Sequence, residues 1–160
     1  MTRYCLTAAL LCASGAGAAL AGTTWDQPGQ GTGISTSSVN QIAEGHMVMQ
    51  ISSSYENVEM EEAEHPMNGA AGPCFGAVEV ASGEVEGGGI CAFTDGAGEK
   101  VVLHWDAEGM DQSGALTGSW TLSGGSGPWA DAKGGGSFSS LTDPETGKFV
   151  NTITSNVTMP

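Results

Sequence analysis

Apolar and polar residues alternate along several stretches of the chain, with the period of two that is typical of β-strands. In one stretch Val101, Leu103 and Trp105 share a face, while His104 and Asp106 fall on the opposite face. The same period puts apolar residues in phase in three other stretches, at Met47, Met49 and Ile51, at Leu116, Trp120 and Leu122, and at Phe149, Ile153 and Val157. No segment shows the apolar stripe of an amphipathic helix.

Turn-forming stretches separate these segments, among them residues 94–100 and 143–148. Residues 23–40 are rich in Gly, Ser and Thr, which indicates either a loop or a loose first strand. The chain holds 26 glycines, which favour tight turns and disfavour helices. Strands separated by such turns predict an all-β sandwich or barrel. We expect a single antiparallel β-barrel of about eight strands, a number that encloses either a packed interior or one small ligand.

The N-terminal residues resemble a secretory signal peptide. Arg3 precedes an apolar run rich in Ala and Leu, and the run ends in Ala19-Leu20-Ala21, a small-x-small cleavage pattern. The apolar run is short and glycine-rich for a membrane span. We therefore expect residues 1–21 to be a signal peptide, residues 22–160 to form one barrel domain, and the mature protein to be periplasmic or secreted.

Removal of this leader changes the charge balance. Residues 22–160 contain three lysines and no arginine against 18 acidic residues, a net charge of −15. Such a field repels nucleic acids and anionic membrane surfaces. Neither is expected as a partner.

Two cysteines, Cys74 and Cys91, remain after export, and in an oxidising compartment two cysteines predict one disulfide bond. A zinc site would require further Cys or His ligands at short spacing, and a redox motif would require Cys-x-x-Cys. Neither pattern occurs here, so the predicted role of the pair is structural.

The spacing of the cysteines also predicts a strand register. A two-residue turn at Ser82-Gly83 would place Cys74 directly opposite Cys91, at a closely spaced non-hydrogen-bonded pair. The same register sets Glu79 against Glu86, a repulsive pair, and the glycines at 87–89 offer a bulge that would shift it.

One segment resembles a known family. Residues 118–138 are similar to the glycine-rich segment of the allene oxide cyclase-like and dirigent-like β-barrels. The matching positions are Gly124, Gly125, Ser126, Gly127, Trp129, Ala132 and Gly134.

The resemblance implies an eight-stranded barrel that binds an apolar substrate and guides cyclisation or coupling without a cofactor. It also implies a homo-oligomer, commonly a trimer. The motif consists mainly of glycines that allow a tight connection, so it bears on the fold more than on activity. Residues 22–160 contain no arginine, so an arginine-dependent site of those families has no counterpart here, and no catalytic residue is assigned.

Four residues are candidate ligand contacts. Trp105 and Trp120 fall on the apolar phases of two strands and would either line a cavity or fill an ordinary core. Asn151 and Ser155 share the phase of the apolar residues in the last strand. If that phase points inward, both would be buried polar groups that orient a ligand or bond to backbone and water.

The histidines and the acidic residues indicate no particular metal site. His46, His65 and His104 lack the spacing of metal ligands, and we expect no metal. The acidic run between Glu56 and Glu64 is typical of a solvated edge strand. It lacks the pattern of a calcium loop, although a weak calcium site stays open.

Two classes of function follow from these observations. The first is an exported barrel that holds a small apolar molecule in its cavity, either as a binding protein or as a cofactor-free isomerase or cyclase. The second is a structural or surface-interaction module with a packed barrel. A cavity lined by Trp105 and Trp120 would favour the first class.

Overall fold

A computed structural model describes residues 22–160, and the expected signal peptide lies outside these residues. The described chain folds into eight β-strands and one short 3-10 helix, η1. Their bounds are β1 (Thr23–Ala43), β2 (His46–Met60), β3 (Gly72–Ala81), β4 (Glu84–Thr94), β5 (Lys100–Met110), β6 (Leu116–Gly125), η1 (Gly127–Ala130), β7 (Lys133–Thr142) and β8 (Lys148–Met159).

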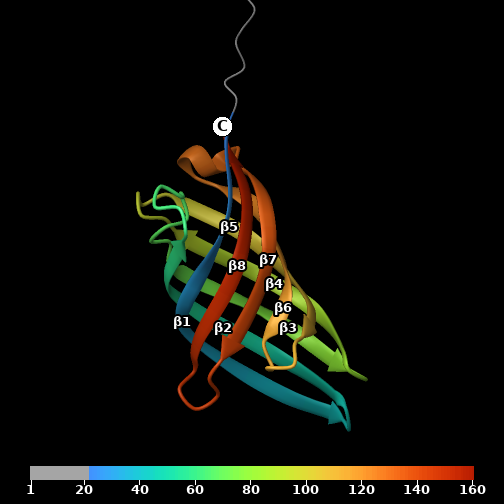
Figure 1. The fold of residues 1–160 in the computed structure, drawn as a ribbon. Helices are drawn as coiled ribbons and strands as arrows, with labels where there is room; N and C mark the ends of the chain where they lie inside the picture. Colours follow the sequence, from blue (N-terminus) through green and yellow to red (C-terminus); the bar gives the residue numbers. More distant parts are fainter. Residues whose placement is uncertain (1–21) are drawn as a thin grey trace, which may run out of the picture.

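The eight strands form one closed antiparallel barrel in which each strand pairs with its neighbours in sequence, and β8 returns to pair with β1 (Figure 1). The predicted fold class is therefore confirmed. The alternation along each strand decides which side chains enter the barrel. Val101, Leu103 and Trp105 of β5 are buried inside, whereas His104 and Asp106 are exposed. Within residues 22–160, no helix is long and apolar enough to span a membrane.

The two ends of the barrel differ. At one end, at the bottom of Figure 1, the strands are joined by the turns after β1, β3, β5 and β7. At the other end, the longer loop between β2 and β3 and helix η1 cover the interior. Met67 of this loop is 3% exposed and Trp129 of η1 is completely buried. We call these the turn end and the loop end.

The glycine-rich segment that resembles the dirigent-like family forms part of the loop end. It runs from the end of β6 through η1 to the start of β7. Gly124, Gly127 and Gly134 have φ angles of 126°, 52° and 137°, which strongly favour glycine. The indole of Trp129 donates a hydrogen bond to Asp95 Oδ2, 2.7 Å away, which ties this segment to the turn between β4 and β5.

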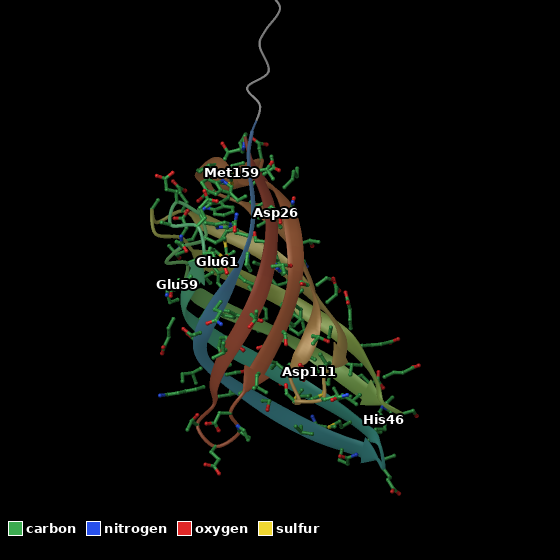
Figure 2. All side chains as sticks on the ribbon, viewed as in Figure 1. Asp26, His46, Glu59, Glu61, Asp111 and Met159 are labelled. Atoms are coloured by element: carbon green, nitrogen blue, oxygen red, sulfur yellow. A yellow bond between two sulfur atoms is a disulfide. The ribbon has the colours of Figure 1, made fainter. Side chains whose placement is uncertain are left out.

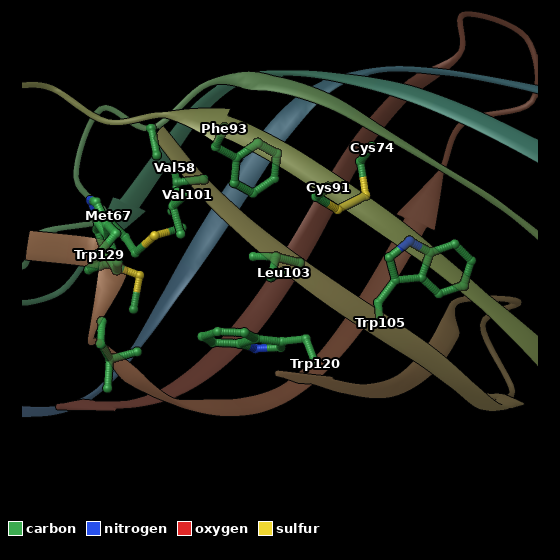
Figure 3. Close-up of a cluster of buried hydrophobic side chains, with 14 of the residues drawn as sticks. Val58, Met67, Cys74, Cys91, Phe93, Val101, Leu103, Trp105, Trp120 and Trp129 are labelled. Carbon is green, nitrogen blue, oxygen red and sulfur yellow. A yellow bond between two sulfur atoms is a disulfide. The ribbon is translucent and has the colours of Figure 1, made fainter. Parts of the chain in front are cut away.

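The cysteine hairpin has the predicted register. Cys74 pairs with Cys91 and Glu79 with Glu86 across β3 and β4, without a bulge. The turn residues Ser82 and Gly83 have φ angles of 55° and 87°, both in the left-handed region that a two-residue hairpin requires. The disulfide between the two cysteines is present and faces the barrel interior (Figure 3).

Two local expectations are met in part. Of the two alternatives for residues 23–40, the strand is the one formed: they belong to β1, a strand of 21 residues whose pairing with β2 shifts register twice. The acidic run is a strand only in part: Glu59 lies on the last part of β2, which pairs with β1 alone beyond Tyr55, and the residues from Glu61 onward belong to the loop before β3. The end of β2 is therefore an edge on its β3 side, as expected, while the rest of the acidic run forms a loop instead of a strand.

Candidate functional site

The barrel encloses a cavity lined by residues from seven of its strands and from the loop between β2 and β3. The centre of a water molecule can occupy about 90 Å³ of it. Much of the wall is aromatic, contributed by Tyr55, Phe93, Trp105, Trp120 and Phe138. A water molecule needs roughly 10–15 Å³ by this measure, so the cavity has room for several waters or for a small organic molecule.

The four residues expected to contact a ligand all line this cavity. Trp105 comes from β5 and Trp120 from β6, where they are a directly opposed pair in the register. Asn151 and Ser155 come from the inward phase of β8. Cys74 and Cys91 of the disulfide also line the cavity. Figure 3 shows Trp105 on one side of Leu103 and Phe93 on the other, with the disulfide beside them.

Glycines on the inward faces make room for the aromatic rings. A Cβ atom on Gly76 would lie 2.5 Å from the indole of Trp105, and one on Gly89 would lie 2.7 Å from its nitrogen. Gly76 and Gly89 are paired across β3 and β4, so together they form a flat surface beneath this indole. A Cβ on Gly31 would lie 2.5 Å from the ring of Tyr55 in the same way. The glycines of this barrel are therefore a part of the cavity's construction.

Tyr55 is the main cavity residue that the sequence did not single out. Its hydroxyl accepts a hydrogen bond from Asn151 Nδ2, 2.7 Å away, and its ring packs against Phe93 and Phe149. Burial raises the pKa of Tyr55 to about 12, although the hydrogen bond from Asn151 acts in the opposite direction. Tyr55 is therefore a neutral phenol, and its own hydroxyl hydrogen can be donated to a further acceptor.

His65 is a second residue that sequence reasoning missed. It lies in the loop between β2 and β3, is 2% exposed and packs its ring edge-on to Trp25. The backbone N–H of Met67 donates to its Nδ1, 3.1 Å away, so the proton of the neutral ring belongs on Nε2. That nitrogen donates to Ser155 Oγ at 3.3 Å, and burial lowers the pKa of His65.

This arrangement does not activate Ser155 as a nucleophile. A general base must accept the serine proton, and in a catalytic triad the other ring nitrogen donates to a carboxylate. Here Nδ1 accepts a backbone N–H, so Nε2 carries the proton and Ser155 accepts it. The His65–Ser155 contact instead holds the loop that covers the loop end of the barrel against β8.

The two cavity tryptophans differ in their hydrogen bonding. Trp120 Nε1 donates to the carbonyl oxygen of Thr154, 3.1 Å away. Trp105 Nε1 and Asn151 Oδ1 have no hydrogen-bond partner, and they are the two buried side-chain polar atoms of residues 22–160 in this condition. Both residues are 7% exposed. Buried polar groups are nearly always paired, so one orphaned donor and one orphaned acceptor in the same cavity are unusual.

The cavity wall carries no charge. All of its lining residues are uncharged, and the polar ones contribute hydroxyl, amide or indole groups. The acidic side chains lie outside or at the ends of the barrel, as Asp26, Glu59, Glu61 and Asp111 do in Figure 2. Among the described residues, no three His, Cys, Asp or Glu side chains are close enough together to hold a metal ion.

The lining of the cavity is more exposed towards the turn end than towards the loop end. Lining residues near the loop end are deeply buried, with Val58 at 2% and Met67 at 3% exposure. Lining residues nearer to the turn end, such as Leu116 and Ser140, are half-buried. The loop end is thus closed by packed side chains, and a ligand would enter between the turns.

No family model matches the chain, and no curated protein sequence matches it. Among solved structures, the chain is similar to the pterocarpan synthase dirigent protein GePTS1. The TM-score is 0.55 with 15% sequence identity, and the match covers 87% of this chain and 92% of that chain. At this identity the likeness establishes the fold alone, an eight-stranded antiparallel β-barrel similar to that of this dirigent protein. The allene oxide cyclase part of the resemblance stays an expectation.

Proposed function

We propose that this protein binds a small, mainly apolar molecule inside its barrel. The observation that carries the proposal is the cavity itself, which is walled by aromatic and aliphatic side chains around a few polar groups. This combination is typical of small-molecule sites, in which apolar walls supply affinity and a few polar atoms fix the orientation. Both expected tryptophans contribute to the wall.

The same cavity suits a cofactor-free reaction. A flexible substrate held between Trp105, Trp120 and Tyr55 would be confined to a folded conformation, which accelerates an intramolecular isomerisation or cyclisation through orientation. The neutral Tyr55 hydroxyl could donate a hydrogen bond to an oxygen where charge develops. The name of the similar structure, a synthase and a dirigent protein, supports this version. Turnover of a candidate substrate would distinguish an enzyme from a carrier.

The alternative function, a structural module with a packed barrel, has less support. A packed barrel would fill its interior with side chains, whereas this barrel leaves about 90 Å³ for the centre of a water molecule. It would also have no need for two unpaired polar atoms in its interior. Ligand binding accounts for both observations with one cause.

The first experiment is native mass spectrometry of the protein purified from its own host. We expect a retained small molecule, seen as added mass that is released on denaturation. A cavity-filling variant, Ser140→Phe, should abolish that added mass, because Ser140 lines the cavity. Ser139→Phe is the matched control, since the adjacent residue on β7 does not line it. Far-UV circular dichroism shows whether both variants keep the β-fold.

Retention of the molecule by Ser140→Phe, with the fold intact, would contradict the proposal. So would a ligand-free wild-type protein that also fails to bind any neutral bicyclic compound in titrations. Loss in both variants would place the bound molecule elsewhere on the barrel.

We also propose that the protein acts outside the cytoplasm. The Cys74–Cys91 disulfide supports this, because structural disulfides are rare where thiols are kept reduced. The intact mass of the natural protein tests it, since export would remove residues 1–21 and leave the chain two hydrogens lighter than its thiol form. The same spectrum reports whether the protein assembles, for example into the expected trimer.

A further inference from the structure

We infer that the cavity recognises a neutral molecule that carries an oxygen able to accept a hydrogen bond from Trp105 Nε1 and a hydroxyl able to donate one to Asn151 Oδ1. This inference rests on the proposed function and specifies the chemistry of the ligand. It makes Trp105 and Asn151 the residues that determine specificity.

The donor half of this subsite is the indole N–H of Trp105. The residue is 7% exposed, and its nitrogen has no partner among the described residues. Figure 3 shows the indole nitrogen on the side of the ring nearer the disulfide. Gly76 and Gly89 leave no room for the ring to move outward, because the barrel backbone lies directly behind it. The N–H is therefore held in place without a protein acceptor. A buried N–H group that makes no hydrogen bond destabilises the ligand-free protein.

The acceptor half is the side-chain carbonyl of Asn151. The amide nitrogen of the same side chain donates to Tyr55, which fixes the orientation of the amide group. Its oxygen is buried without a hydrogen-bond partner, on a side chain that lines the cavity. A neutral amide oxygen accepts from a hydroxyl or an N–H group and repels a carboxylate.

The absence of charge in the wall defines the class of ligand further. A charged molecule would lose its hydration on entry and meet no opposite charge, since every lining residue is uncharged. A hydrocarbon would enter but would leave both orphaned groups unsatisfied. A neutral alcohol, or a hydroxyl compound with a second oxygen, carries a suitable partner for each group.

Four compounds of one shape test this inference by calorimetry on the full protein. They are naphthalene, 2-methoxynaphthalene, which only accepts, 2-naphthol, which accepts and donates, and the anion 2-naphthoate. We expect 2-naphthol to bind roughly tenfold more tightly than naphthalene, with the methoxy compound between them. A purely apolar cavity would give the reverse order, because the hydroxyl group would have to be desolvated without compensation. We expect no binding of 2-naphthoate.

Matched variants assign the effect to each residue. Trp105→Phe should remove the preference for 2-methoxynaphthalene over naphthalene, whereas Trp120→Phe should keep it, because Trp120 already donates to Thr154. Asn151→Leu should remove the preference for 2-naphthol over 2-methoxynaphthalene. Tyr55→Phe, which breaks the Tyr55–Asn151 bond but keeps the Asn151 oxygen, should retain most of it.

A direct reading comes from the wild-type protein, and Trp105→Phe is needed only to assign one signal. In the ¹H–¹⁵N spectrum of the wild-type protein, the indole N–H signal of Trp105 should move downfield when 2-naphthol binds and should move little with naphthalene. That signal is identified by its loss in Trp105→Phe. If naphthalene binds as tightly as 2-naphthol, or the indole signal stays in place, the polar subsite is wrong and the cavity proposal stands. If none of the three neutral compounds binds, both proposals are overturned.

Discussion

Asn151 on β8 donates a hydrogen bond to the hydroxyl of Tyr55 on β2, with 2.7 Å between the heavy atoms and 96 residues between the two positions in the chain. The two strands are not neighbours, since β1 lies between them. The bond therefore passes over the inner face of β1 and joins the two strands that flank it. It also places a neutral phenol and a fixed amide group where a bound molecule would sit.

The raised pKa of Tyr55 predicts a loss of stability in alkali. The folded state holds the phenol proton up to about pH 12, whereas the unfolded chain releases it near pH 10. The stabilisation that comes from the raised pKa of Tyr55 is thus fully present below pH 10, and it is lost as the pH rises towards 12. The expected loss is roughly 3 kcal/mol, taken from the size of the shift.

Urea unfolding between pH 8 and 12 measures this loss, and absorbance of the phenolate at 295 nm reports the titration. A Tyr4→Phe background leaves Tyr55 as the sole tyrosine of the chain. In that background, Tyr55→Phe is the control and should show a flatter profile over the same range. Equal profiles for the two proteins would contradict the prediction.

The lowered pKa of His65 predicts that the stability of the protein falls in mild acid. Burial lowers its pKa in the folded state, so below about pH 6.5 the unfolded chain binds a proton that the folded protein refuses. Stability is complete above that pH and falls as the pH drops towards the folded pKa, with a slope of at most about 1.4 kcal/mol per pH unit. Protonation of Nδ1 would also remove the acceptor for the Met67 N–H.

The measurement is the urea midpoint at pH 7.5, 6.5, 5.5 and 5.0. His65→Gln should flatten the profile, while His104→Gln, at an exposed position on β5, should reproduce the wild-type slope. The result that contradicts this account is a slope that survives in His65→Gln. Asp95, Asp111 and Asp143 also have lowered pKa values, but their contributions are lost below about pH 4 and do not overlap this window.

The disulfide between Cys74 and Cys91 predicts a large stability difference. It closes a loop with a sequence separation of 17, so its removal in the double variant Cys74→Ala, Cys91→Ala should lower the free energy of unfolding by about 3 kcal/mol. Urea unfolding with and without dithiothreitol measures it. The reductant should lower the midpoint of the wild-type protein and leave that of the double variant unchanged. A reductant-insensitive wild type would show that the bond does not constrain unfolding.

The sequence predicts the barrel well where the information is local. The period of two along residues 101–105 and 149–157 is enough to tell which side chains face inward, because a strand has only two faces. The register of the cysteine hairpin follows from a single turn, since Ser82 and Gly83 fix every pair up to Cys74 and Cys91. Asn151 and Ser155 could be placed in the interior for the same reason.

The two buried residues that escaped prediction, Tyr55 in the cavity wall and His65 in the covering loop, depend on long-range closure. Tyr55 begins an acidic stretch that looks solvated, and its contact with Asn151 exists only because β8 closes the barrel against β1. His65 lies in a loop without periodicity and reaches β8 through Ser155, 90 residues away. One signal was available: Gly31 and Gly33 repeat on a single face of β1, as expected where a large ring packs against a strand.

That glycine signal leads to a prediction about how the cavity is built. An Ala Cβ at position 31 would meet ring carbons of Tyr55 at 2.5 and 2.9 Å, and its three nearest atoms all belong to this ring. Gly31 does not adopt a positive φ angle, so Ala is compatible with the backbone and the clash is with this ring alone. Gly31→Ala should therefore destabilise the protein by roughly 1–3 kcal/mol, the usual effect of overpacking.

In a Tyr55→Leu background, the same substitution should have less than half that effect. Urea unfolding of the four proteins gives the coupling energy between the two positions, and a value near zero would show that Gly31 does not make room for Tyr55.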